Sequence, residues 1–353
     1  MTTPSPTTTP RELLFAVVEA RGAGGLMGPE PGVADAHDRV AIVGLDGVAR
    51  AKADFTPRKD PVVGNAGGVL QPEARVAGGR VFFADGTGVV RELTRSGNYR
   101  VATFALKPQQ EISFGVSADG AHLEASRYTF PPVNPSPSNP GETFLSNNYR
   151  YELLAADGGA ANRTLVTTNG GFEVLQQPDV VGWDATGPIA TRDTQFGTQS
   201  GTSGRTLWGH AVRLDAAGHP GPVLGGPDCS VMSITGDVLL CVDDRQVGYS
   251  VRRSDGTIMW TVPPRPQGQI YAYIVLSPDQ ARVAYAGGVR GRDGSTMTLP
   301  AKFNPEGWLD NQTLIGITGE NNQQEMAVVR LANPSQIDDL GFKGEFIGVV
   351  QAP

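Results

Sequence analysis

Few residues in this 353-residue sequence have the type and spacing to carry out chemistry. Asp35, His37 and Asp38 stand in one short run, where two carboxylates and an imidazole could bind a metal ion or transfer a proton. The same run is also typical of a solvated turn. His210 and His219 fall in a predicted outer strand and a predicted turn, and neither position leads towards a shared centre.

Known catalytic patterns are missing from the rest of the sequence. The glycine-rich stretches match neither the Walker pattern nor Gly-x-Gly-x-x-Gly, and neither His-Glu-x-x-His nor Gly-x-Ser-x-Gly occurs. Asp243-Asp244 and Asp338-Asp339 are adjacent pairs, and neighbouring strand positions point to opposite faces, so neither pair forms a converging site. The two cysteines and four scattered histidines disfavour a zinc site. We therefore expect no resident metal and no cofactor.

The order of strands and turns indicates the fold. An apolar strand followed by a tight acidic-glycine turn returns about every 45–50 residues, the period typical of a propeller blade. Asp and Gly fit such turns because they tolerate positive φ. Four clear turns are Leu45-Asp46-Gly47, Ser117-Ala118-Asp119-Gly120, Ala156-Asp157-Gly158 and Ser254-Asp255-Gly256.

Two of these repeats resemble a known family. Ser277-Pro278-Asp279-Gln280-Ala281-Arg282-Val283-Ala284 is similar to the Ser-Pro-Asp-Gly turn and following apolar strand of bacterial TolB-like and WD40-like β-propellers, with Gln280 in place of Gly. Ser117-Ala118-Asp119-Gly120-Ala121-His122-Leu123 matches the same pattern with Ala118 in place of Pro. The resemblance covers most of the chain after residue 12. It implies a propeller and no particular function, because propellers carry many unrelated activities.

We predict one all-β domain over residues 12–353, a β-propeller of seven four-stranded blades. Blade 1 receives its outer three strands from Glu12–Ala20, Arg39–Leu45 and Val48–Phe55. The apolar run Glu345–Val350 has no blade of its own, so we expect it to join blade 1 as the inner strand and close the ring. Six blades are the alternative count, if a weak sixth blade merges with a neighbour. That blade is predicted at 270–276, 281–286, 295–299 and near 301–303.

Two features bear on the cellular compartment. Residues 1–11 are rich in Ser, Thr and Pro and form a disordered leader, similar to the spacer after the acylated cysteine of exported bacterial lipoproteins. The resemblance implies export, with membrane contact only through an N-terminal lipid anchor. Cys229 and Cys241 flank a predicted hairpin turn that places them opposite each other, within reach of a disulfide. Two buried free thiols and a cytoplasmic location are the alternatives.

The long insertions are predicted to share one end of the ring. They fall between the second and third strands of a blade, at 21–38, 129–148 and 193–206, with a shorter one at 287–294. In a propeller these b–c connections leave at the same end as the blade-to-blade connections, which we call the loop face; the short a–b and c–d turns form the turn face. Long loops on a rigid scaffold often carry function.

Aromatic residues are the candidate contacts for a partner. Phe130, Phe144 and Phe196 lie in the insertions and could fill pockets of a partner, or they could hold their loops on the scaffold. Trp183 and Trp308 are predicted on inner strands, where they either pack in the core or offer a stacking platform for a sugar or a peptide.

These observations predict a non-catalytic binding or scaffold module outside the cytoplasm, a monomer whose loop face engages a protein, a peptide or a cell-envelope glycan. The net charge of −7 disfavours a nucleic-acid partner, because such a surface is basic. The alternative is a propeller enzyme, a glycan lyase or hydrolase, with its site in the central funnel.

Overall fold

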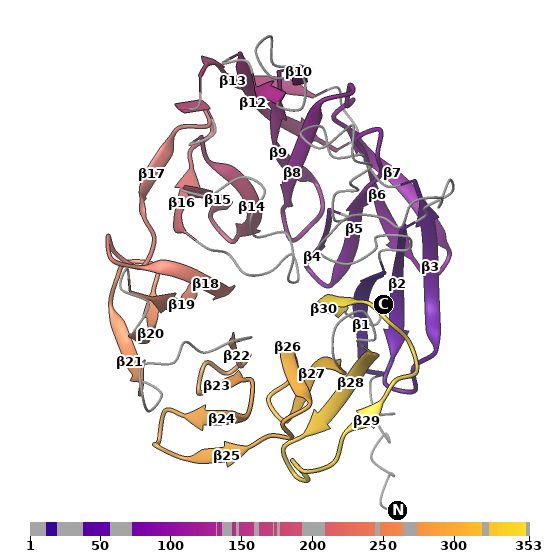
Figure 1. The fold of residues 1–353 in the computed structure, drawn as a ribbon, viewed down its shortest axis with the longest axis vertical. Helices are drawn as coiled ribbons and strands as arrows, with labels where there is room; N and C mark the ends of the chain where they lie inside the picture. The colour runs from indigo at the N-terminus through magenta and orange to yellow at the C-terminus, as the bar shows by residue number, and fades with distance from the viewer. Residues whose placement is uncertain are drawn as a thin grey trace, which may run out of the picture.

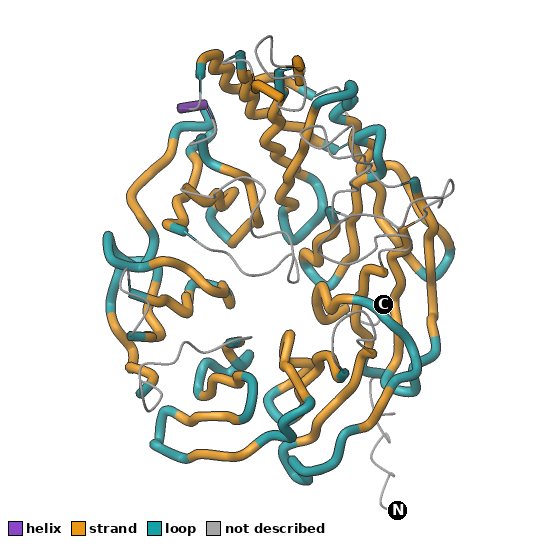
Figure 2. Tube along the Cα trace, viewed as in Figure 1, coloured by secondary structure: helices purple, strands orange, loops and turns teal. Residues whose placement is uncertain are grey.

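The structure is a computed structural model of the chain, and seven four-stranded antiparallel sheets stand around a ring in it (Figure 1). Strands make up almost all of the regular structure (Figure 2). The described residues are 12–19, 38–56, 73–131, 133–135, 143–145, 148–158, 162–171, 173–174, 177–192, 209–243, 248–263, 274–319 and 325–350. The predicted propeller and its seven blades are confirmed, and the count of six is wrong.

Blade 1 is built from both ends of the chain, as the sequence predicts. From the axis outward it contains β30 (Glu345–Val350), β1 (Leu14–Glu19), β2 (Asp38–Gly44) and β3 (Ala49–Phe55). β30 runs antiparallel to β1, with Val350 paired to Leu14 and Glu345 paired to Val18. The apolar run at the end of the chain therefore closes the ring.

The other blades follow one another along the chain. Blade 2 contains β4 (Ala74–Ala77), β5 (Arg80–Ala84), β6 (Val89–Thr94) and β7 (Gly97–Thr103). Blade 3 contains β8 (Gln110–Val116), β9 (His122–Thr129), β12 (Tyr149–Asp157) and β13 (Arg163–Gly170). A separate hairpin of β10 (Val133–Pro135) and β11 (Thr143–Leu145) lies in its b–c connection. Blade 4 contains β14 (Asp179–Asp184), β15 (Gly187–Arg192), β16 (His210–Leu214) and β17 (Pro220–Val223).

The last three blades keep the same order. Blade 5 contains β18 (Ser230–Thr235), β19 (Val238–Val242), β20 (Tyr249–Arg253) and β21 (Ile258–Val262). Blade 6 contains β22 (Val275–Leu276), β23 (Arg282–Tyr285), β24 (Gly288–Gly291) and β25 (Thr296–Thr298). Blade 7 contains β26 (Phe303–Asp310), β27 (Thr313–Thr318), β28 (Glu325–Arg330) and β29 (Asp338–Asp339).

Blade 6 corrects one detail of the prediction. Residues 287–294 are not a b–c insertion, because β24 occupies Gly288–Gly291 and Gly288 pairs directly with Tyr285. Gly287 has a φ of 96°, which allows a two-residue turn where a loop was expected. The predicted third strand at 295–299 is consequently the outer strand β25, and the predicted outer strand near 301–303 overlaps the start of β26.

The core is divided into seven apolar clusters, one at each seam between neighbouring blades. The seam of blades 2 and 3, for example, holds Phe82, Phe104 and Phe114, and that of blades 6 and 7 holds Phe303 and Trp308. Side chains alternate between the two faces of a strand, so each sheet contributes one row to each neighbouring seam.

The repeated turn motif has the same hydrogen bonds in its two best copies. Ser117 Oγ donates to Asp119 Oδ1 (2.5 Å) and accepts from His122 N (2.9 Å). In the second copy Ser277 Oγ donates to Asp279 Oδ1 (2.6 Å) and accepts from the amide of the residue that starts β23 (3.0 Å). The serine and aspartate of the motif therefore satisfy the backbone of a tight turn, which is a structural use of both polar side chains.

Candidate functional site

The predicted contact residues lie in different environments. Phe130 is 3% exposed and its ring stands edge-on to Tyr149, with centroids 6.1 Å apart, inside the core between blades 3 and 4. Phe130 is therefore a core residue, a position that fits the second of its two predicted roles, that of holding its loop on the scaffold. The backbone of Phe144 pairs with Asn134 in the β10–β11 hairpin. Phe196 lies outside the described residues.

Of the three possible metal ligands, the structure describes only Asp38. Asp38 begins β2 and is only 1% exposed, while Asp35 and His37 lie outside the described residues. Across the described ranges, no group of three or more His, Cys, Asp and Glu side chains could hold a metal ion. His219 lies on the turn face beside Asp215, with Nδ1 and Oδ2 3.4 Å apart.

The two tryptophans singled out in the sequence lie in different environments. Trp308 is 5% exposed, and its Nε1 donates to the carbonyl of Val275 (3.2 Å), so it is a core residue of the seam between blades 6 and 7. Trp183 is half-buried at the end of β14 on the turn face. Its ring stacks on the ring of His122, with centroids 6.4 Å apart and planes 19° apart.

The stacked pair belongs to a cluster of aromatic and charged side chains at the turn-face end of the seam between blades 3 and 4. His122 begins β9, and its Nδ1 lies 2.8 Å from Oδ1 of Asp157, which is directly opposite on β12. Arg163 approaches the other carboxylate oxygen of Asp157 at 3.9 Å. This cluster was not predicted from the sequence, because its members come from four strands and meet only once the β9–β12 register and the packing of blade 4 are known.

Glu124 lies two residues further along β9 and is 6% exposed. Among the described residues its Oε2 is buried without a hydrogen-bond partner. Burial raises the pKa of Glu124 to about 7; Arg163 opposes the shift, and the charges of Asp157 and Asp215 add to it. A carboxyl group of this kind takes up or releases a proton near neutral pH.

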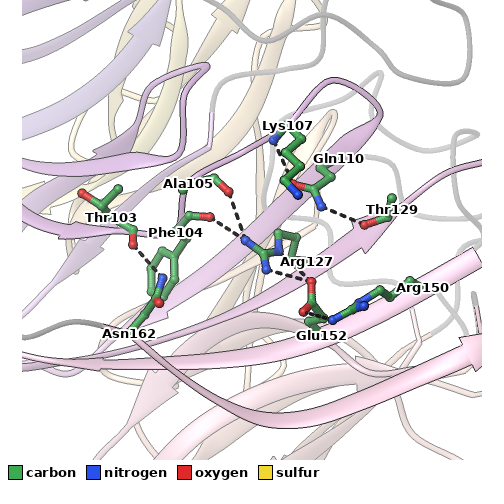
Figure 3. Close-up of polar contacts among 10 residues, drawn as sticks. All are labelled: Thr103, Phe104, Ala105, Lys107, Gln110, Arg127, Thr129, Arg150, Glu152 and Asn162. Atoms are coloured by element: carbon green, nitrogen blue, oxygen red, sulfur yellow. Dashed lines mark hydrogen bonds and ion pairs between the residues drawn. The ribbon is translucent and has the colours of Figure 1, made fainter.

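A second buried glutamate in the same blade has the opposite surroundings (Figure 3). Glu152 accepts from Arg127 Nη2 and Arg150 Nη2, both at 2.7 Å. Arg127 Nη1 in turn donates to the carbonyls of Phe104 and Ala105 at 3.0 Å, which ties blade 3 to blade 2. Burial disfavours the ionised form of Glu152, but the hydrogen bonds from the two arginines outweigh it and hold its pKa below the usual value.

The predicted disulfide between Cys229 and Cys241 is present, with Cα atoms 5.1 Å apart, and the alternative of free thiols is wrong. The cysteines are not directly opposite, because the hairpin turns at Gly236 and Asp237, between the pair Thr235 and Val238, and this register pairs Cys241 with Val231. Cys229 lies diagonally across from Cys241, just before β18. Both are fully buried in the seam between blades 4 and 5.

Comparisons with known proteins identify the fold. No family model and no curated protein matches the sequence. Solved structures that are similar include a functionally unknown protein from Desulfotomaculum acetoxidans (TM-score 0.50, 10% identity, 96% of this chain and 99% of that one). Others are oligogalacturonate lyase from Vibrio parahaemolyticus (0.48, 8%, 92% and 91%) and TolB from Acinetobacter baumannii (0.38, 12%, 96% and 83%). Likeness at these identities concerns the fold alone and shows no activity.

Proposed function

We propose that this propeller is a non-catalytic binding or scaffold module, and that its loop face engages a protein, a peptide or a cell-envelope glycan. The observation that carries the proposal is the difference between the two ends of the ring. On the turn face, the hydrogen-bonding groups of the described turns bond to their own backbones and to the neighbouring blades. The longest connections leave from the opposite end.

The aspartates of the turns serve their own backbones. Asp184, Asp215, Asp255 and Asp310 each accept from an amide two residues ahead, at 2.7–2.8 Å. Such a carboxylate is committed to the turn that it caps, which makes it a poor group for holding a partner.

Several turns are also bonded to the next blade. Arg282 Nη1 donates to the carbonyl of Asn311 in blade 7 (2.9 Å), and Trp260 Nε1 donates from blade 5 to the carbonyl of Gln280 in blade 6 (3.1 Å). Arg80 Nη1 donates from blade 2 to the carbonyl of Asp119 in blade 3. Several turns of the turn face therefore join neighbouring blades, and the loop face, which carries the longest connections, is the end that we assign to recognition.

The disulfide supports the extracytoplasmic part of the proposal, because disulfides persist in oxidising compartments. The composition of residues 1–11 is the only support for a lipid anchor.

A loop replacement tests which face binds. The β15–β16 ladder reaches the pair Arg192 and His210, so a two-residue Asn-Gly turn can replace residues 193–209 without breaking it. The turn-face control is Asp255→Asn. Both variants and the parent chain are applied to a peptide library and to an array of cell-envelope glycans.

We expect the shortened variant to keep its melting temperature and lose binding by 10-fold or more, on the order of the effect of losing one hot spot. Asp255→Asn should bind like the parent. Binding that survives loop removal and fails in Asp255→Asn would reverse the assignment of the face. Cleavage of an array glycan would replace the proposal with the enzyme alternative.

A further inference from the structure

The seam between blades 3 and 4 contains polar side chains beside its apolar cluster. The hydroxyl of Ser113 donates to the carbonyl of Val180 (2.6 Å), and that of Ser126 donates to Asp179 Oδ1 (2.7 Å). Glu124 lies beside this row without such a partner for its Oε2. A buried carboxyl group with an oxygen that lacks a partner is costly when ionised and tolerable when protonated.

The strand register places Glu124 against blade 4. It is paired with Gly115 on β8 and with Ala155 on β12, and paired residues point to the same side of the sheet. That side faces blade 4, because a Cβ on Gly115 would stand 2.4 Å from the carbonyl oxygen of Gly182. The carboxyl group is therefore flanked by two small residues and covered by the neighbouring blade.

Charged groups near Glu124 belong to both blades. Those that face it from the packed elements are His122 of β9, Asp157 of β12, Arg163 of β13, and Asp215 with its neighbour His219 between β16 and β17. Blade 4 also presents Asp179 and Asp184, whose carboxylates already accept from Ser126 and Arg213. Arg213 is already bonded to Asp184, which leaves Arg163 as the arginine that opposes Asp157 and Asp215, so ionising Glu124 adds like charge to the seam.

We propose that the seam between blades 3 and 4 is a pH-sensitive joint, closed while Glu124 is protonated and loosened at its turn-face end when Glu124 ionises. Ionisation brings a buried negative charge next to Asp157 and Asp215, and the seam relieves it by admitting water. The stacking of Trp183 on His122 lies at the same end of the seam and would open with it.

The direction in which stability changes with pH follows from the pKa of Glu124 in the folded and the unfolded chain. The folded chain keeps the Glu124 proton up to about pH 7, whereas an ordinary glutamate loses it near 4.5. Between these values the folded chain binds more protons than the unfolded chain, so this residue makes stability fall as pH rises. Above pH 7 the contribution becomes constant.

The test compares Glu124→Gln with Glu152→Gln. Glutamine keeps the shape of a protonated glutamate and cannot ionise. The two glutamates are matched, since they are 6% and 5% exposed and lie on neighbouring strands of one blade, but only Glu152 has arginine partners. Melting temperatures of the full chain and both variants are measured from pH 5.5 to 8.5, together with amide hydrogen exchange.

For Glu124→Gln we expect a melting temperature above that of the parent, by a margin that grows by about 2–4 °C between pH 5.5 and pH 8.5. At pH 8.5 exchange in peptides covering β9 and β14 should be at least about 5-fold slower than in the parent, a difference of about 1 kcal/mol in opening. Peptides from blade 6 should not change. Glu152→Gln should melt below the parent at every pH.

A difference between Glu124→Gln and the parent that is constant over pH overturns the proposal. So does a difference in exchange that is spread evenly over all blades. If the variant folds poorly, the infrared absorption of a protonated carboxylic acid in the parent chain decides the matter. Its presence at pH 6 and loss by pH 8.5 support the proposal, and its absence at pH 6 overturns it.

Discussion

Gly307 packs directly against the ring of Phe346, so closely that a Cβ on Gly307 would stand 2.0 Å from Cε1 of that ring. Gly307 belongs to the inner strand of blade 7 and Phe346 to β30, the strand that closes blade 1. Phe346 is 4% exposed and has the ring of Phe15 on its other side, with centroids 6.4 Å apart. The contact is the joint at which the ring closes.

Gly307→Ala should destabilise the protein by about 1–3 kcal/mol, because the added methyl group overpacks this joint. Gly182→Ala is the matched control: Gly182 also lies on an inner strand, and a Cβ there meets no atom within 4 Å. Urea denaturation of both variants measures the difference. Equal stability of the two variants would mean that the Phe346 ring moves aside freely.

Deleting residues 344–353 should destabilise the protein more than Gly307→Ala does. A truncated chain that melts within about one degree of the parent would refute closure by β30.

Gln280→Gly should stabilise the protein by about 0.5–1 kcal/mol. Gln280 has a φ of 61°, a conformation that glycine adopts without strain, and glycine is the residue expected in this turn. The matching turn provides the opposite test, because Gly120 has a φ of 69° and a Cβ there would stand 2.3 Å from Arg80 Nη1. Gly120→Ala should therefore lower the melting temperature while Gln280→Gly raises it. Changes of the same sign in both turns would contradict this account.

Acid should weaken the turn face. A hydrogen bond from Ser117 and one from the amide of Ala121 lower the pKa of Asp119, and the amides of His219 and Ala217 do the same for Asp215. A lowered carboxyl pKa gives stability that is complete above the unfolded value, near 3.8, and is lost as pH falls through the folded value. Asp119→Asn should accordingly reduce the slope of melting temperature against pH below about pH 4. An unchanged slope would show that these carboxylates do not control acid unfolding.

The disulfide should resist reagents until the chain unfolds. Cys229 and Cys241 are both fully buried, so alkylation of the native chain should add no mass, and reduction under denaturing conditions should expose two thiols. Replacing both by Ser should cost about 2–4 kcal/mol. Intact mass and denaturant midpoints check both statements. Two thiols that alkylate in denatured, unreduced protein would remove the support for an oxidising compartment.

Phe130→Ala should destabilise the protein by about 3–5 kcal/mol, because it leaves a cavity beside Tyr149 in the seam of blades 3 and 4. Tyr99, 52% exposed on an outer strand, is the control, and Tyr99→Ala should change stability by no more than about 0.5 kcal/mol. Loss of binding with no loss of stability in Phe130→Ala would restore this residue to the contact surface.

The sequence predicted best those features that depend on local chemistry. The Ser-x-Asp turn at Ser117 fixes its own backbone through side-chain hydrogen bonds, so its position is readable without the rest of the fold. Closure by Glu345–Val350 was predictable for a different reason, since an apolar run without a local partner must find a distant one. The prediction was wrong at Gly287 and Gly288. Glycine is typical of loops, but here the two residues lie in a tight turn and at the start of a short strand.

The cluster around Glu124 could not be predicted from the sequence, for a physical reason. Its burial, its missing partner and its charged neighbours depend on the β9–β12 register and on how blade 4 lies against blade 3. A glutamate between two apolar residues, Leu123-Glu124-Ala125, was the available signal. Phe130 shows the same limit, since its sequence position beside prolines says nothing about which way its ring turns.

The pairing of Leu14 with Val350 determines how the molecule can be held at a surface. The two residues occupy the place where the other blades have their a–b turn, so both chain ends leave the ring side by side on the turn face. A biotin, a linker or a lipid attached ahead of Glu12 or behind Val350 would hold the molecule by its turn face. Every molecule in such a layer would then present its b–c connections outward, and both termini can be used for immobilisation without masking them.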